Sequence, residues 1–139
     1  MLKELDKNIE SIKTKLGNSD ELVCKEITCG KTRCAIFYML GLSDTQSLSY
    51  FVISPLMDYS KNIQDLKTLE REVLTLSETT EEFDEQNIIS NILKGKCVLF
   101  VDGIDKCLVL SIDKYKERAI DEPPTSSVIK GPRSGFVEN

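Results

Sequence analysis

Two aspartates placed three positions apart are the residues of this sequence with the clearest potential for chemistry. Asp102 and Asp105 enclose Gly103 and Ile104 and lie between two apolar runs. Paired carboxylates shift each other's affinity for protons, so such a pair can hold a divalent metal or act in acid-base catalysis. Aspartate beside glycine is more commonly part of a tight turn. We therefore predict that Asp102, Gly103 and Asp105 form a structural turn, with a small metal-dependent enzyme as the alternative.

Other groups that carry chemistry are scarce. The 139 residues include no histidine, so no serine or cysteine can be activated by an imidazole base. Gly30-Lys31-Thr32 is similar to the end of a phosphate-binding loop, but that loop needs a glycine where Lys25 stands and a helix where a strand-like run follows. We therefore expect a protein that is not an enzyme, with no catalytic, cofactor-binding or metal-binding residues.

The cysteines also favour structure over chemistry. Their number is odd, no secretion signal precedes them, and each lies in an apolar, strand-like run. These features are typical of reduced thiols that act as small core residues. The cysteines are Cys24, Cys29, Cys34, Cys97 and Cys107.

Composition and charge exclude two classes of partner. The sequence is 40% hydrophobic and 29% charged, as in ordinary soluble domains, and its net charge is -5. Nucleic acid binding needs a basic stripe, and none is found. No apolar run approaches the roughly 20 residues of a membrane span. We expect a soluble domain that binds no nucleic acid.

The elements that position Asp102 and Asp105 are predicted to be two strands. Cys97 to Val101 and Cys107 to Leu110 are continuous apolar runs, which with the turn between them predict a β-hairpin. Pairing Asp102 with Asp105 leaves both faces of this hairpin apolar, so it belongs in the middle of a sheet covered by helices on both sides. One face would carry Cys97, Leu99, Val101, Leu108 and Leu110, and the other Val98, Phe100, Cys107 and Val109.

A second hairpin is predicted earlier in the chain. Leu22 to Cys29 and Cys34 to Leu40 are strand-like, and Gly30-Lys31-Thr32 separates them. The return strand has no charged residue and should also be central. The predicted fold class is α/β, with a small mixed sheet of about four to five strands built from two hairpins and with helices on both faces.

Apolar residues at helical spacing predict the covering helices. These run from Leu2 to Leu16, from Ser47 to Ile53 before Pro55, from Ile63 to Leu69, and from Thr80 or Asp84 to Leu93, with Phe83, Ile88, Ile89, Ile92 and Leu93 buried. Val73 to Leu76 is predicted as an edge strand, with an extension of the preceding helix as the alternative. Five acids are expected to complement the dipole at the start of the last helix: Glu78, Glu81, Glu82, Asp84 and Glu85.

The character of the chain changes after Ile112. Asp121 to Ser127 contains two prolines and is predicted to be an extended segment. Gly131 to Gly135 is predicted to be a turn. We therefore divide the chain into an α/β subdomain, residues 1–120, and a connector, residues 121–139, that leads toward a second subdomain.

The order of several local motifs resembles a known family. A helix ending Ile-Leu-Lys-Gly at Gly95 precedes a strand ending Phe-Val-Asp-Gly at Gly103, then Asp105-Lys106 and a second strand. The later motifs are Arg118, Glu122-Pro123, Gly131-Pro132-Arg133 and Gly135-Phe136. This pattern resembles the A subunit of the GerA-type spore germinant receptors, the GerA/SpoVAF family.

The resemblance implies a role in nutrient-triggered spore germination. The family's A subunit is a multi-span protein of the spore inner membrane with two soluble N-terminal α/β subdomains. This chain would be the first of them, expected on the cytoplasmic (core) side. Implied partners are the second subdomain and membrane region of the same protein, the B and C subunits, and a small nutrient. A pure scaffold subdomain is a further alternative. Expected subdomain contacts are Arg118, Glu122, Pro123, Gly131, Pro132 and Arg133.

Overall fold

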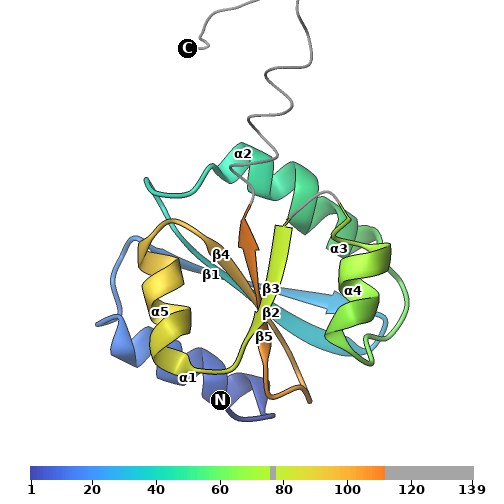
Figure 1. Cartoon of the computed structure of the whole chain (residues 1–139), viewed down its shortest axis with the longest axis horizontal. Coiled ribbons are helices and arrows are strands. Elements are labelled where there is room, and N and C mark those ends of the chain that lie inside the picture. Colours follow the sequence, from blue (N-terminus) through green and yellow to red (C-terminus); the bar gives the residue numbers. More distant parts are fainter. Residues whose placement is uncertain (76–77, 112–139) are drawn as a thin grey trace, which may run out of the picture.

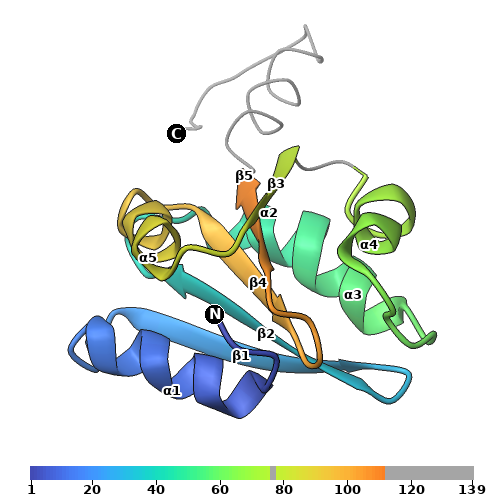
Figure 2. The same cartoon turned by 60° about the horizontal axis from the view of Figure 1, so that its bottom comes forward.

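A five-stranded sheet with helices on both faces forms the centre of the protein (Figures 1 and 2). The computed structural model describes residues 1–75 and 78–111. The helices are α1 (Leu5–Lys15), α2 (Thr45–Leu48), the π-helical η1 (Ser49–Ile53), α3 (Ser54–Asp58), α4 (Leu66–Glu72) and α5 (Glu85–Leu93). The strands are β1 (Leu22–Cys29), β2 (Thr32–Met39), β3 (Glu78–Glu82), β4 (Cys97–Val101) and β5 (Cys107–Ser111).

The register of the β4–β5 hairpin confirms the predicted faces. Phe100 lies opposite Cys107 and Leu99 opposite Leu108, and the same register extended by two residues sets Asp102 opposite Asp105. Successive side chains along each strand point to opposite faces of the sheet, and residues paired across the two strands share a face. Because β4 lies between β2 and β5 in the strand order β1-β2-β4-β5-β3, it occupies the centre of the sheet.

Each face of the sheet has its own hydrophobic core. One core joins Leu99 and Leu108 to the segment from α2 to α4, and the other joins Phe100 to α1 and α5. All five residues of β4 are buried. In the second core the rings of Phe37 and Phe100 meet edge to face, with centroids 5.6 Å apart. The predicted α/β fold with helices on both faces is therefore confirmed.

The prediction of a mixed sheet is wrong in one respect, because every described strand pair is antiparallel. The two hairpins lie side by side through β2 and β4, and β3 joins at the edge beside β5. No crossover between parallel neighbours is needed for this order.

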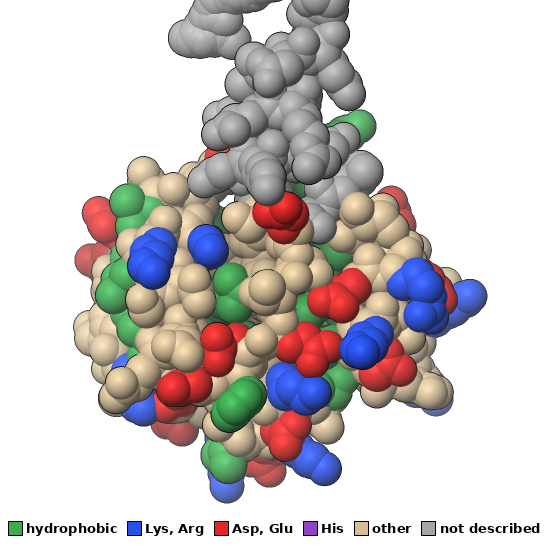
Figure 3. Space-filling model, in the orientation of Figure 1, with side chains coloured by type: hydrophobic (Ala, Val, Ile, Leu, Met, Phe, Trp, Pro, Cys, Tyr) green, Lys and Arg blue, Asp and Glu red, His purple; other side chains and the backbone are tan. Residues whose placement is uncertain are grey.

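The position of the edge strand is also corrected. Val73 is the C-cap of α4, and the N–H groups of Val73 and Leu74 both donate to the carbonyl of Leu69, so the predicted strand does not form over the described residues 73–75. Residue 76 lies outside the described residues. The strand is Glu78–Glu82 instead, and only Asp84 and Glu85 lie at the start of α5, where Asp84 caps the helix. Charged residues suit an edge strand, because they discourage pairing with other chains. Acidic side chains lie over this edge in Figure 3.

Pro55 does not end a helix as predicted. The chain stays helical from Thr45 to Asp58, and Pro55 falls in the first turn of α3, just after the π-helical turn η1. Because proline has no backbone N–H, one intrahelical hydrogen bond is missing at this point of the continuous helical segment, and the π-helical turn η1 lies directly before it. Ser54 is helical despite preceding this proline.

Several helix details differ from the spacing-based predictions. Helix α1 begins at Leu5 rather than Leu2, and Ile63 precedes α4 rather than belonging to it. Phe83 and Leu93 were expected to be buried, but they are 69% and 52% exposed. Phe83 precedes α5 and Leu93 is its last residue, and the buried face of the helix is carried by Ile88 and Ile92.

The cysteines are free thiols, as predicted. Four are buried in the two cores, and Cys24 is half-buried. Burial raises the pKa of the Cys107 thiol to about 12, and it raises the pKa of Cys34 and Cys97 further. These thiols are therefore protonated and unreactive at neutral pH.

Within residues 1–75 and 78–111, no helix has the length and apolar character needed to cross a membrane.

Candidate functional site

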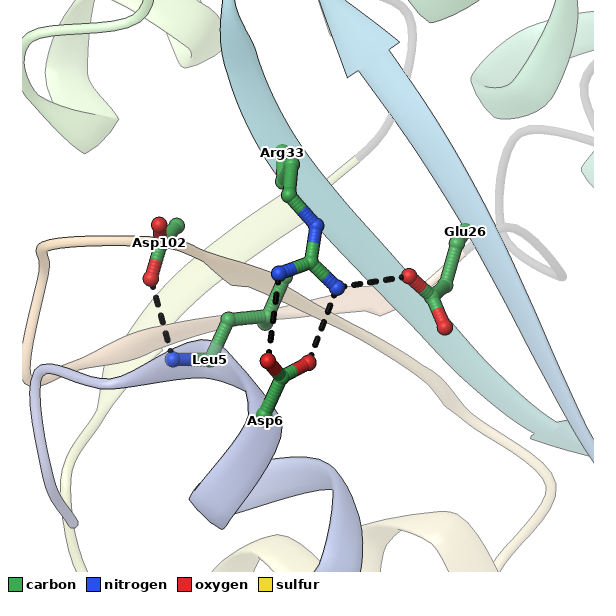
Figure 4. A network of polar contacts seen from close by, with 5 residues as sticks. All are labelled: Leu5, Asp6, Glu26, Arg33 and Asp102. Atoms are coloured by element: carbon green, nitrogen blue, oxygen red, sulfur yellow. Dashed lines mark hydrogen bonds and ion pairs between the residues drawn. The ribbon is translucent and has the colours of Figure 1, made fainter.

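Asp102 joins the β4–β5 turn to the start of helix α1 (Figure 4). Its Oδ1 accepts a hydrogen bond of 3.0 Å from the backbone N–H of Leu5, the first residue of α1. The side chain of Glu4, the residue at the N-cap position of α1, makes no capping hydrogen bond. Asp102 therefore supplies the hydrogen-bond acceptor that Glu4 does not provide, although it lies in a turn far along the chain. Its negative charge also stabilises the positive end of the helix dipole at the N-terminus of α1.

Backbone hydrogen bonds fix the same turn from two other sides. The N–H of Asp102 donates to the carbonyl of Arg33 on β2 at 2.9 Å, and the N–H of Gly103 donates to the carbonyl of Lys3 at 2.8 Å. Gly103 has a φ of 90°, which favours glycine at this position. The turn thus connects the N-terminal segment, β2 and the central hairpin.

An ion-pair network continues from this point across α1 and the first hairpin (Figure 4). Arg33 donates to both oxygens of Asp6, at 2.8 and 3.3 Å, and to Glu26 at 2.9 Å. The hydrogen bond from Arg33 lowers the pKa of the Asp6 carboxyl. All three side chains are substantially exposed, so the network orients α1 on the β1–β2 hairpin and adds little stability.

The alternative of a metal site at Asp102 and Asp105 gains no support from this geometry. Asp102 already accepts the Leu5 N–H. Residues 1–75 and 78–111 contain no group of three or more His, Cys, Asp or Glu side chains arranged to hold a metal ion. What the structure brings together here is a structural contact between a turn and a helix.

Sequence reasoning missed an open pocket beside the same turn. It has a volume of about 510 Å³ and lies between α4, edge strand β3 and the β4–β5 turn. Its polar lining combines charges of both signs from segments far apart in the chain. The spacing of Lys67 and Arg71, four residues apart, is the one signal in the sequence that points to it. The lining residues are Gln64, Asp65, Leu66, Lys67, Thr68, Arg71, Glu81, Ile104 and Lys106.

The predicted subdomain contacts cannot be placed beside these features. Arg118, Glu122, Pro123, Gly131, Pro132 and Arg133 lie outside the described residues, as does the connector 121–139.

Comparison with known proteins identifies the family. Residues 10–139 match the family described as Bacillus/Clostridium GerA spore germination protein. Spore germination protein KA of Bacillus subtilis (strain 168) is 29% identical over 140 residues, which cover 97% of this chain and 26% of that protein. Spore germination protein GerLA of Bacillus cereus is 26% identical over 146 residues, which cover 99% of this chain and 30% of that protein. The chain thus spans less than a third of the length of either relative.

A solved structure shares the fold. The crystal structure of the N-terminal domain of the A subunit of the Bacillus megaterium spore germinant receptor GerK3 has 27% sequence identity and a TM-score of 0.67. The match covers 78% of this chain and 46% of that one. These findings confirm the resemblance predicted from the motifs around Gly95 and Gly103. The chain belongs to the GerA family of spore germination proteins.

Proposed function

We propose that this chain is the first α/β subdomain of the N-terminal region of a germinant receptor A subunit, where it serves assembly and nutrient sensing without catalysis. The fold shared with the N-terminal domain of the GerK3 A subunit carries this proposal. The chain covers 46% of that domain, which supports its interpretation as one of two subdomains.

The contacts of the conspicuous carboxylate support a non-enzymatic role. Asp102, the residue best placed for acid-base or metal chemistry, accepts a hydrogen bond from the start of α1. The two cores fill both faces of the sheet with apolar side chains. The Asp102 carboxylate is therefore used to hold the central hairpin and α1 together.

Residues 121–139 act in this proposal as the connector to the second subdomain. Proline restricts the backbone in advance, and opposite charges set the register between neighbouring units. The connecting contacts are Arg118, Glu122, Pro123, Gly131, Pro132 and Arg133. The further partners are the membrane region of the same protein and the B and C subunits, with the whole receptor in the spore inner membrane and this subdomain on the core side.

Complementation of spores that lack the full-length gene tests this function. The wild-type gene should restore nutrient-triggered germination, measured as release of dipicolinic acid. The double variant Asp102→Asn, Asp105→Asn should restore it equally, because asparagine keeps an oxygen acceptor for the Leu5 N–H and removes both carboxylates. Arg133→Glu should impair germination at a normal receptor level.

Two outcomes contradict the proposal. Full germination with Arg133→Glu at a normal receptor level would show that Arg133 makes no essential contact between the subdomains. Loss of germination with the double asparagine variant, again at a normal receptor level, indicates that the carboxylates carry chemistry.

A further inference from the structure

The pocket between α4, β3 and the β4–β5 turn brings three cationic side chains together. Lys67 and Arg71 are four residues apart on α4, so they project from one face of that helix. Lys106 reaches the same pocket from the turn. In Figure 3, basic side chains lie over α4 and near the β4–β5 turn. Two separate elements therefore direct positive charge to one hollow.

These cations are only partly neutralised by the protein. Lys67 makes no ion pair within 4 Å among the described residues, although its charge and that of Arg71 help to lower the pKa of the nearby Asp65 carboxyl. Arg71 approaches its neighbour Glu72 at 3.6 Å, and its side chain remains 69% exposed. Lys106 pairs with Glu81 at 3.1 Å. Two of the three cations are thus available to a ligand, and the third is held in position by an acid.

The acidic lining is occupied by structural contacts. Asp65 accepts hydrogen bonds from the Thr68 N–H at 2.7 Å and from the Thr68 hydroxyl at 2.8 Å, and these bonds lower the pKa of its carboxyl. The first turn of α4 is therefore already capped by its own sequence, so side chains and not helix N–H groups must bind any ligand. Three cations and two acids line the pocket of a chain whose net charge is -5.

One side-chain hydrogen bond joins two of the elements that line the pocket. The hydroxyl of Thr79 on β3 donates to Glu70 on α4 at 2.8 Å. Ile104 and Leu66 give the pocket an apolar part. A volume of about 510 Å³ is within the range of small-molecule sites.

We propose that this pocket binds a small anionic ligand through a carboxylate or phosphate group held by Lys67, Arg71 and Lys106. The planar guanidinium of Arg71 matches either oxyanion with two parallel hydrogen bonds, and the two lysines add point charges. The partly buried Ile104 accepts the apolar body of such a ligand. This site rests on the side chains around the pocket and is independent of the role proposed in germination.

Titration of the 139-residue chain with two probes tests the site. Inorganic phosphate and succinate are added separately at low ionic strength, and binding is measured by amide shifts in ¹H–¹⁵N NMR spectra. Saturable shifts around Lys67, Arg71 and Lys106 are expected with at least one probe, and the stronger probe identifies phosphate or carboxylate as the recognised group. Binding should weaken as salt is added, because exposed charges are screened.

Two substitutions distinguish binding in this pocket from nonspecific attraction of anions to exposed cations. Arg71→Gln should weaken binding about tenfold, since a charge-assisted hydrogen bond is lost. The matched control is Lys94→Gln, which removes one exposed cation at the far end of α5. Both side chains are exposed, so both variants should keep the wild-type unfolding temperature. The proposal is overturned if neither probe binds below about 10 mM, or if Arg71→Gln and Lys94→Gln weaken binding equally.

Discussion

Replacement of Asp102 by alanine removes the acceptor for the first N–H of α1 and leaves the other contacts of the turn in place. The hydrogen bond from Leu5 is partly buried and 3.0 Å long, and Glu4 offers no substitute cap. Loss of a helix-capping side chain costs about 1 kcal/mol of protein stability. For a domain of this size, that loss lowers the unfolding temperature by about 4 °C.

Two matched variants isolate this contact. Asp102→Asn retains an oxygen acceptor and should lose at most a few tenths of a kcal/mol from the missing charge. Asp105→Ala lies in the same turn, but its carboxylate accepts no hydrogen bond from the described residues, so it should stay within about 0.5 kcal/mol of wild type. Urea unfolding followed by circular dichroism gives the three free energies.

Hydrogen exchange locates the effect. In Asp102→Ala the amides of the first turn of α1 should exchange faster, whereas those of β4 should keep their protection, because the sheet pairs of β4 do not involve Asp102. Equal destabilisation by Asp102→Ala and Asp105→Ala would refute the capping role. So would a loss with Asp102→Asn as large as that with alanine.

Three further changes test the core, a close backbone approach and an ion pair. Phe100→Ala, in the fully packed second core, should cost about 3 to 5 kcal/mol in urea unfolding, whereas Phe83→Ala, 69% exposed, should cost little. Gly30→Ala should destabilise by more than about 1 kcal/mol, because φ is +60° and the new Cβ would lie 2.8 Å from the backbone nitrogen of Asn62; an unchanged midpoint would contradict this. The hydrogen bonds of Glu85 to Lys15 and Ser11 lower its pKa, so their stabilisation is present above its unfolded-state pKa of about 4.3 and is lost as pH falls through the lower folded value. The stability difference between wild type and Glu85→Gln should therefore shrink on acidification, and a difference that grows would exclude this linkage.

The central hairpin was predictable because its pattern is local. The alternation on either side of Gly103 determines which side chains share a face, and the turn residues determine the register. Asp102 opposite Asp105 and Phe100 in a core both follow from these two signals.

The missed features depend on contacts between distant segments. Glu78–Glu82 has little strand propensity, and it forms β3 because β5 offers a free edge. The π-helical turn before Pro55 has no composition signal. The pocket arises only when α4 packs near the β4–β5 turn, so Lys67 and Lys106 give no sign of their proximity in the sequence.

The strand order has a consequence for synthesis on the ribosome. β1 and β2 can pair as soon as they emerge, but β4 inserts between β2 and β5, and β3 has no neighbour until β5 follows it. The N-terminal helix likewise obtains its Asp102 cap only after almost the whole described chain has been translated. The nascent protein therefore exposes the open β2 edge of its first hairpin until β4 has been translated, and during this interval that edge can pair with other chains.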